Sequence, residues 1–360
     1  SMNIVAYTKV ANEGWVAYAF DVVSPESGLQ ASKISASDFT IDVKVWNTVR
    51  ENAAKVLNVV DIPGGVRLET EPVSFRGLHL KGTGTAAAIN FTNEDVTEVK
   101  TEWADKFEAR NENGVLYRLY SPEAAGPRPL VLFLHGGGEC GTDNWLQMVG
   151  TLGAARIAED YPDVYVMAPQ APRGLLNPLT GQVKMPRTFA ESNMKGETGW
   201  HRKYLANICD IIRDMIKAGK VNPNRVYVTG LSMGGGGTLR VLSVGSDLFA
   251  AAVPICPTMT PETYDILCSL VNTKIWIATA YVDHTIYRHK YIVDGIMKLR
   301  DAGNNHARLT LFSPEDLQKY GIATDPDVPY NVLFSQNHAS WVPVYNNEFG
   351  IMDWLLSQNK

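Results

Sequence analysis

The sequence predicts an α/β fold, with a mostly parallel sheet flanked by helices, preceded by a small all-β sandwich. In the first hundred residues, short alternating segments are separated by polar turns. Beyond them, apolar strands alternate with amphipathic helices, which is typical of a parallel sheet covered on both faces. A chain of 360 residues also exceeds what one hydrophobic core usually organises. We therefore expect two domains, residues 1–100 and residues 101–360.

The expected strands of the first domain are short stretches in which apolar and polar residues alternate. Several such stretches with turn residues between them favour a sandwich of two antiparallel sheets. The sequence lacks a Cys…Trp…Cys pattern, so the term immunoglobulin-like describes only the architecture. The expected strands are residues 14–23, 39–46, 55–60, 66–69 and 86–91.

The second domain begins with two strands that we expect to pair as an antiparallel edge, and the remaining strands should run parallel. Apolar residues with helical spacing predict helices over residues 205–216 and 286–302, and a third helix is expected over residues 235–244. The expected strands are residues 106–110, 116–120, 130–134, 164–168, 225–229, 251–255, 274–280 and 332–335.

Composition and charge exclude some classes of function. A formal net charge of -5 argues against general nucleic-acid binding, which requires a basic surface. No apolar run reaches the roughly 18 residues that span a bilayer, so a soluble protein is expected. The compartment stays open: cytoplasmic, unless a signal peptide has been removed from a secreted or periplasmic protein. The four cysteines are too few for a disulfide framework and have no CxxC spacing, so we expect free thiols rather than a Cys256–Cys268 bridge.

The pattern Gly-x-Ser-x-Gly around Ser232 follows an apolar strand directly. In this pattern the serine lies on a sharp turn between strand and helix, and the flanking glycines let the two elements approach closely. A serine on such a turn projects its hydroxyl into a cleft. We therefore expect Ser232 to be a nucleophile that forms a covalent acyl-enzyme.

A serine nucleophile needs a base and an orienting carboxylate, in the chain order Ser, Asp or Glu, His. Asp283 follows the expected strand 274–280, although an N-cap of the next helix would occupy the same position. His338 follows the last expected strand, directly before the terminal helix. The expected catalytic residues are therefore Ser232, Asp283 and His338.

A His-Gly-Gly-Gly segment beginning at His135 follows the expected strand 130–134. In esterases such a loop exposes backbone amides to the substrate oxygen, and each donor contributes roughly 3 to 4 kcal/mol. We expect the amides of Gly137, Gly138 and Met233 to form the oxyanion hole. Phosphate binding is disfavoured, because the sequence has no GxxxxGK[ST] pattern. His135 is interpreted as a side chain that holds the loop.

These motifs allow a resemblance to be stated. Residues 106–360 resemble α/β-hydrolase esterases of the polyhydroxybutyrate-depolymerase-like group, some of which have been labelled predicted peptidases. An immunoglobulin-like domain before the catalytic part is also similar to the layout of bacterial esterases. The family commonly reads Gly-Glu-Arg-Gly where this chain has Gly138-Glu139-Cys140-Gly141, so contacts of that arginine do not carry over. The resemblance is carried by residues 135–139, 141–144, 168–170 and 229–235, with Asp283, Asn337 and His338.

The resemblance implies a serine carboxylesterase that acts on small esters of short-to-medium acyl length without metal or cofactor. A peptidase and a polyester or feruloyl esterase on the same triad remain alternatives, as does a noncatalytic protein that binds carbohydrate or a partner. Residues 169–199 should form a specificity loop, and a homo-oligomer through the first domain is left open. Three tryptophans near the motifs either line a substrate pocket or pack in the core: Trp145, Trp200 and Trp341.

Overall fold

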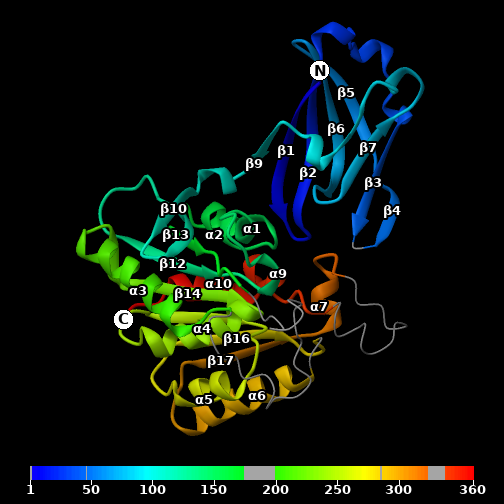
Figure 1. Cartoon of the computed structure of the whole chain (residues 1–360). Helices are drawn as coiled ribbons and strands as arrows, with labels where there is room; N and C mark the ends of the chain where they lie inside the picture. Colours follow the sequence, from blue (N-terminus) through cyan, green and yellow to red (C-terminus); the bar gives the residue numbers. More distant parts are fainter. Residues whose placement is uncertain (1, 46, 174–198, 284–285, 323–336) are drawn as a thin grey trace, which may run out of the picture. The chain divides into compact units, whose positions relative to one another are not determined.

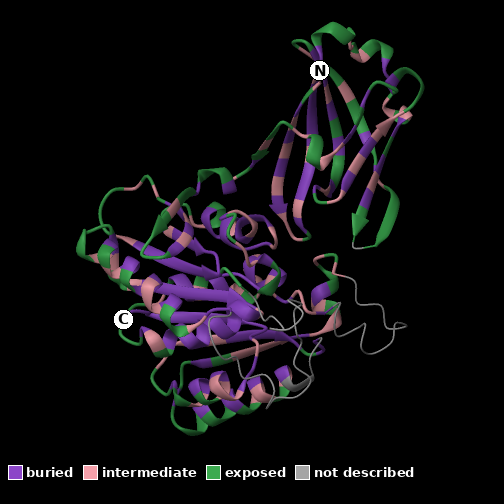
Figure 2. Cartoon of the chain, in the orientation of Figure 1, coloured by how far each residue is buried: buried purple, intermediate pink, exposed green. Residues whose placement is uncertain are grey.

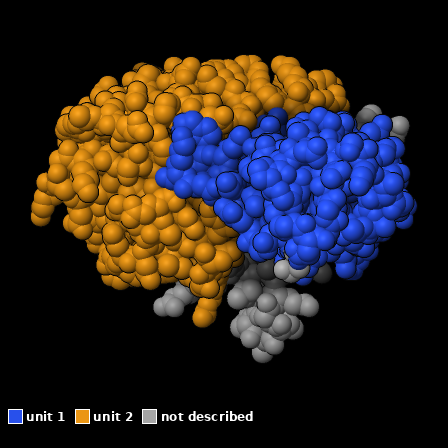
Figure 3. Space-filling view, turned by 90° about the horizontal axis from the view of Figure 1, so that it is seen from above, with its two compact units in different colours: residues 1–106 blue, residues 107–360 orange. Residues whose placement is uncertain are grey.

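The computed structural model describes residues 2–45, 47–173, 199–283, 286–322 and 337–360. The chain divides into two compact units, Ser1–Lys106 and Phe107–Lys360, which Figure 3 colours separately. The division lies beyond residue 100 because residues 98–101 form a strand that pairs in parallel with the first strand of the chain. These residues therefore belong to the first unit.

The first unit is a sandwich of two sheets. Its strands are β1 (Asn3–Ala11), β2 (Gly14–Val23), β3 (Phe39–Val45), β4 (Thr48–Ala54), β5 (Val56–Ile62), β6 (Gly65–Ser74), β7 (Leu78–Gly82), β8 (Asn90–Thr92) and β9 (Glu98–Thr101). One sheet has the order β5-β6-β2-β1-β9 and the other β4-β3-β7-β8. Apolar side chains from both sheets, including Phe20, Ile41 and Leu68, form one buried cluster. Burial of this cluster holds the sheets together.

The expected strand over residues 86–91 is wrong in its first part. Residues Gly84–Ala86 form a 3-10 helix, and β8 begins only at Asn90. Three consecutive alanines at positions 86–88 have low strand propensity, and the turn is closed by a bond from Gly82 N–H to Ile89 O at 2.8 Å. The alternation pattern also did not predict β1, β4, β7 and β9.

The second unit contains a mixed eight-stranded sheet in the order β10-β11-β13-β12-β14-β15-β16-β17. The strands β10 and β11 form the expected antiparallel edge. The other six strands, β12 to β17, run parallel to one another. The expected strand 332–335 lies outside the described residues. The strands are β10 (Glu108–Glu112), β11 (Val115–Tyr120), β12 (Arg128–Leu134), β13 (Tyr165–Pro169), β14 (Val221–Leu231), β15 (Ala251–Ile255), β16 (Ile275–Ala280) and β17 (Ala307–Phe312).

Helices cover both faces of this sheet (Figure 1). They are α1 (Leu146–Val149), α2 (Ala154–Asp160), α3 (Arg202–Lys217), α4 (Met233–Val244), α5 (Pro261–Ser269), α6 (Ile286–Asp301), α7 (Pro314–Gln318), α9 (Trp341–Tyr345) and α10 (Ile351–Leu356). Leu130 and Leu132 of β12 share a core cluster with apolar residues of α3 to α6. The next residue, Phe133, points to the other face and contacts the ring of Tyr345 on α9. Alternate residues of one strand thus reach opposite layers.

The central strands are consequently buried on both faces (Figure 2). Among the described helices, none has the length and apolar character needed to cross a bilayer. All four cysteines are free thiols, so the Cys256–Cys268 bridge does not form.

Candidate active site

The residues singled out by the motifs gather at one edge of the large sheet. The glycine-rich loop follows β12, Ser232 follows β14 and Asp283 lies a few residues after β16. Because these strands run parallel, their carboxyl ends meet at the same edge. This is the edge at which open α/β sheets build their ligand sites.

Ser232 lies on a strained turn between β14 and α4, with φ 57° and ψ -118°. Hydrogen bonds fix the turn to the end of the neighbouring strand: Ser232 N–H donates to Ile255 O at 2.9 Å, and Thr258 N–H donates to Ser232 O at 3.0 Å. Gly234 lies so close to the end of β12 and the start of the following loop that a Cβ there would stand 1.9 Å from Leu134 O and 2.5 Å from His135 O. Only glycine therefore permits this approach of helix and loop.

A continuous hydrogen-bond chain joins Ser232, His338 and Asp283. His338 Nε2 lies 3.0 Å from Ser232 Oγ, and His338 Nδ1 lies 2.9 Å from Asp283 Oδ1. The Asp283 side chain is fully buried, whereas that of His338 is 21% exposed. With the carboxylate accepting the Nδ1 proton, Nε2 can accept the proton of the serine hydroxyl. The arrangement can therefore generate an alkoxide nucleophile.

The glycine-rich loop packs against the serine turn and leaves open space beside two of its amides. A Cβ at Gly136 would meet Leu231 at 2.9 Å, which shows how closely the loop approaches the end of β14. At Gly137 and Gly138, both exposed, a Cβ would meet no atom within 4 Å. Met233 is the first residue of α4, so its N–H has no intrahelical acceptor. All three expected donors thus belong to segments bordering Ser232.

The buried ring of His135 fixes this loop through two hydrogen bonds. Its Nδ1 lies 2.6 Å from Gly136 O, while Nε2 accepts a bond from Ala171 N–H at 2.9 Å. Both bonds require a neutral ring that is protonated on Nδ1 only. Burial lowers the pKa of His135 from 6.5 to about 4. His135 is therefore a neutral structural side chain throughout the neutral pH range.

Gln170 fixes the following part of the loop. Its Nε2 donates to Glu139 O at 3.0 Å and to Asp143 Oδ1 at 2.7 Å, and its Oε1 accepts from Asn144 N–H at 2.7 Å. Cys140, at the position where the family commonly has arginine, packs partly buried against the core. Burial raises the pKa of the Cys140 thiol to about 12, so it stays protonated.

The three tryptophans lie in different environments. Trp200 is fully buried, and its indole donates to His135 O at 3.0 Å, so it packs in the core below the loop. Trp145 is half-buried under the guanidinium of Arg118, 4.8 Å from the ring centroid. Trp341 stands edge-on to the His338 ring at 5.5 Å. Most of the expected specificity loop, residues 174–198, lies outside the described residues.

Sequence reasoning missed two residues beside the triad. Arg288 is 3% exposed on α6 and lies 3.6 Å from Asp283 Oδ2. Cys256 follows β15 with φ 35°, and its ligand atom lies within 4.8 Å of those of Asp283 and His338. Cysteine, aspartate and histidine can ligate metals, but both ring nitrogens of His338 are already engaged. A metal bound here would have to displace a triad hydrogen bond.

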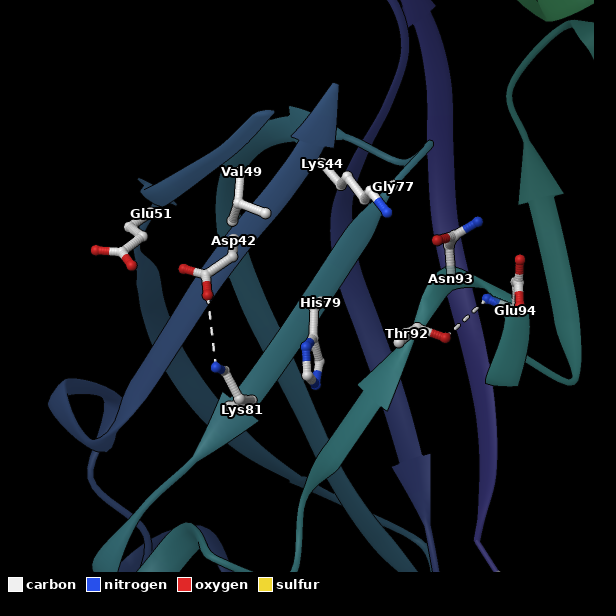
Figure 4. Close-up of a pocket in the computed structure, with 10 residues that line it drawn as sticks. All are labelled: Asp42, Lys44, Val49, Glu51, Gly77, His79, Lys81, Thr92, Asn93 and Glu94. Atoms are coloured by element: carbon white, nitrogen blue, oxygen red, sulfur yellow. Dashed lines mark hydrogen bonds and ion pairs between the residues drawn. The ribbon is translucent and has the colours of Figure 1, made fainter. Parts of the chain in front are cut away.

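A cavity of about 590 Å³ opens on the four-stranded sheet of the first unit (Figure 4). It contains a histidine, but His79 bonds to Asn90 Oδ1 at 2.7 Å. The one hydroxyl among the described lining residues, Thr92 Oγ1, accepts from Glu94 N–H at 3.3 Å. No pair of hydroxyl nucleophile and base is therefore formed by the described lining residues, in contrast to the second unit.

Comparisons with known proteins agree with this fold. A sequence model of the prolyl oligopeptidase family matches residues 184–310, which include Ser232 and Asp283. The chain has no match among curated proteins. The crystal structure of a thermostable esterase is 25% identical to this chain, covers 99% of it and 100% of its own length, and has a TM-score of 0.67.

Two further solved structures match a smaller share of the chain. An S-formylglutathione hydrolase from Agrobacterium tumefaciens is 13% identical, with 71% of this chain and 95% of its own covered at a TM-score of 0.44. A fluorophosphonate-binding serine hydrolase from Staphylococcus aureus is 14% identical, with 70% and 98% covered at a TM-score of 0.43.

The second unit thus has the α/β-hydrolase fold, and the strands before it form an all-β sandwich. The chain is an enzyme of the serine hydrolase class.

Proposed function

We propose that the chain is a serine carboxylesterase that hydrolyses small esters of short-to-medium acyl length. Ser232 Oγ attacks the ester carbonyl while His338 takes its proton, and His338 then returns the proton to the leaving alcohol. Asp283 orients His338 through Nδ1. The amides of Gly137, Gly138 and Met233 donate to the oxyanion. In the second half of the reaction, water attacks the acyl-enzyme carbonyl while His338 takes a proton from it. His338 then returns the proton to Ser232 Oγ, and the carboxylic acid is released.

The hydrogen-bond chain at the serine turn is the observation that carries this proposal. Bonds of 3.0 Å and 2.9 Å connect nucleophile, base and acid in the order that acyl transfer requires. The likeness to a thermostable esterase over 99% of the chain adds support for ester substrates. The sequence resemblance narrows the proposal to the polyhydroxybutyrate-depolymerase-like group.

Replacement of the nucleophile tests the proposal directly. Ser232→Ala should reduce turnover of p-nitrophenyl acetate and butyrate by at least about 1,000-fold, because no acyl-enzyme can form. Ser243→Ala is the matched control, because Ser243 is exposed on the same helix and contacts Arg202. It should leave turnover unchanged. Full activity of the Ser232→Ala protein would refute the assignment.

Peptide hydrolysis is a second candidate, favoured by the match of residues 184–310 to the prolyl oligopeptidase family. Amides and esters pass through the same tetrahedral intermediate, so the triad serves both. A panel of peptide anilides measured beside esters of increasing acyl length, with feruloyl and polyester substrates included, separates them. A higher kcat/KM for peptides than for every ester would establish the peptidase.

A further inference from the structure

A buried arginine lies behind the triad on the first turns of α6. Its side chain is 4% exposed and faces the fully buried side chain of Asp283, with Nη1 3.6 Å from Oδ2. The same nitrogen donates to Cys256 O at 2.7 Å and lies 3.2 Å from His338 Nδ1. Arg288 therefore lies beside both Asp283 and His338.

Stability alone is a poor explanation for a guanidinium in this place. Removing a charge from water costs several kcal/mol unless its partners are close and all its donors are satisfied. Here the ion pair is longer than a hydrogen bond, and Arg288 Nε has no hydrogen-bond partner among the residues that the structure describes. An apolar side chain of similar volume would avoid this cost. Stabilisation of the fold therefore does not account for the charge at this position.

Charges around His338 act in opposite directions. Asp283 favours a proton on the imidazole, whereas the Arg288 guanidinium opposes a second positive charge at 3.2 Å. Cys256 is the other titratable group described here, and burial raises the pKa of its thiol to about 12, so it stays neutral. Ser232 and Trp341 also contact the ring and carry no charge.

We propose that Arg288 is a positioning residue of the triad, an inference that rests on the proposed function. Its guanidinium holds the Oδ2 side of Asp283, so that Oδ1 faces His338 Nδ1. It also offsets part of the carboxylate charge, so that His338 remains an unprotonated base in mildly acidic solution.

The test is the pH dependence of two reactions at Ser232. One is labelling by a fluorophosphonate, and the other is kcat/KM for p-nitrophenyl acetate. In Arg288→Met the acid limb of both profiles should move upward by about one pH unit, because a charge next to the base is lost. The plateau should fall about tenfold, because Asp283 is held less firmly.

Arg288→Lys separates charge from geometry. An ammonium keeps the positive charge but loses the planar fork. The acid limb should therefore stay close to that of the unaltered protein, while the plateau remains reduced. Should Arg288→Met not fold, Arg288→Gln takes its place. NMR titration of the His338 ring must show the same upward shift without any reaction.

Arg240→Met is the matched control for the loss of a buried arginine. Arg240 is 6% exposed and pairs with Glu262 at 2.7 Å, so its replacement also removes a buried charge. It should lower stability and leave the acid limb in place. An acid limb and a His338 titration that do not move in Arg288→Met or Arg288→Gln would overturn the proposal.

Failure of the ester hypothesis is distinguishable from failure of this inference. If the unaltered protein is labelled by fluorophosphonate but hydrolyses no ester, the proposed substrate is wrong and the labelling profile still decides the role of Arg288. If folded protein is not labelled, the nucleophile assignment fails and the inference about Arg288 fails with it.

Discussion

Asp21 in the sandwich and Asp283 in the hydrolase unit are both buried carboxylates beside an arginine, yet they are bound differently. Arg67 grips Asp21 through two bonds of 2.6 and 2.9 Å, and Tyr7 adds a third at 2.7 Å. Asp283 gives its 2.9 Å contact to His338, and Arg288 stays at 3.6 Å. The carboxylate of Asp21 is thus engaged mainly by Arg67, whereas the carboxylate of Asp283 makes its shorter contact with the base, His338.

The same contrast extends over each unit. Among the described residues, histidine and charged side chains that are buried occur once in the sandwich, as Asp21, and repeatedly in the hydrolase unit, as His135, Glu139, Arg240, Asp283 and Arg288. Buried charge is costly, so it is found mainly where chemistry requires it. In the part of the chain that the structure describes, buried ionisable side chains are therefore concentrated in the unit that contains Ser232.

Replacing each acid by its amide should give the largest difference between the two units. Asp283→Asn should lower kcat for p-nitrophenyl esters by about 10,000-fold, because an amide favours the wrong tautomer of His338. Asp21→Asn should leave kcat unchanged and lower the free energy of unfolding by about 1 kcal/mol, because Arg67 is 40% exposed. Steady-state kinetics and urea denaturation measure both effects. Equal losses of activity in the two variants would contradict the contrast.

Acid should destabilise the two units in different pH ranges. The pKa of His135 is lowered by burial from 6.5 to about 4, so the unfolded chain binds the extra proton first. The contribution of His135 is therefore complete above pH 6.5 and is lost as pH falls toward 4, about 3 kcal/mol in total. Bonding to Arg67 lowers the pKa of Asp21 below its ordinary 3.8, so that contribution is lost only in stronger acid.

Hydrogen exchange in urea, followed by peptide for each unit, measures these free energies. Between pH 6.5 and 4.5 the hydrolase unit should lose protection before the sandwich does. The variant His135→Gln should have a flatter pH dependence in the hydrolase unit, because the titrating ring is gone. Loss of protection at the same pH in both units would show that His135 does not govern the difference.

Two glycines within the hydrolase unit sharpen the distinction between structural and reactive positions. In Gly234→Ala the methyl group would stand 1.9 Å from Leu134 O, so we expect at least about 2 kcal/mol of destabilisation. In Gly137→Ala the methyl group meets no atom within 4 Å, so the thermal midpoint should not change. Its kcat/KM should nevertheless fall about 10- to 100-fold, because the methyl occupies space beside the expected oxyanion.

Thermal unfolding and ester kinetics on both variants are the measurement. Wild-type kinetics in the Gly137→Ala protein would place the substrate oxygen elsewhere, and wild-type stability in the Gly234→Ala protein would mean that loop and helix separate at little cost.

The regular elements of the hydrolase unit were largely predictable. Helical spacing over residues 205–216 and 286–302 corresponds to α3 and α6, which extend over Arg202–Lys217 and Ile286–Asp301. These elements pack one face on a sheet, so local periodicity reports them. The strand expected over residues 86–91 is wrong in its first part, because that segment forms a turn closed by local hydrogen bonds such as Gly82 N–H to Ile89 O, which the alternation of apolar and polar residues does not report. The boundary expected near residue 100 falls inside β9 (Glu98–Thr101), a strand that is recognised only through its pairing with β1.

The sequence by itself determined where Ser232, Asp283 and the glycine-rich loop stand, because strand ends and turns are encoded by neighbouring residues. Only the tertiary structure decided that Trp200 packs in the core and that Arg288 reaches His338, a residue 50 positions away along the chain. Helical periodicity places an arginine on a helix but does not show which buried group it meets. That contact depends on how α6 packs beside β16, and packing is a property of the whole unit.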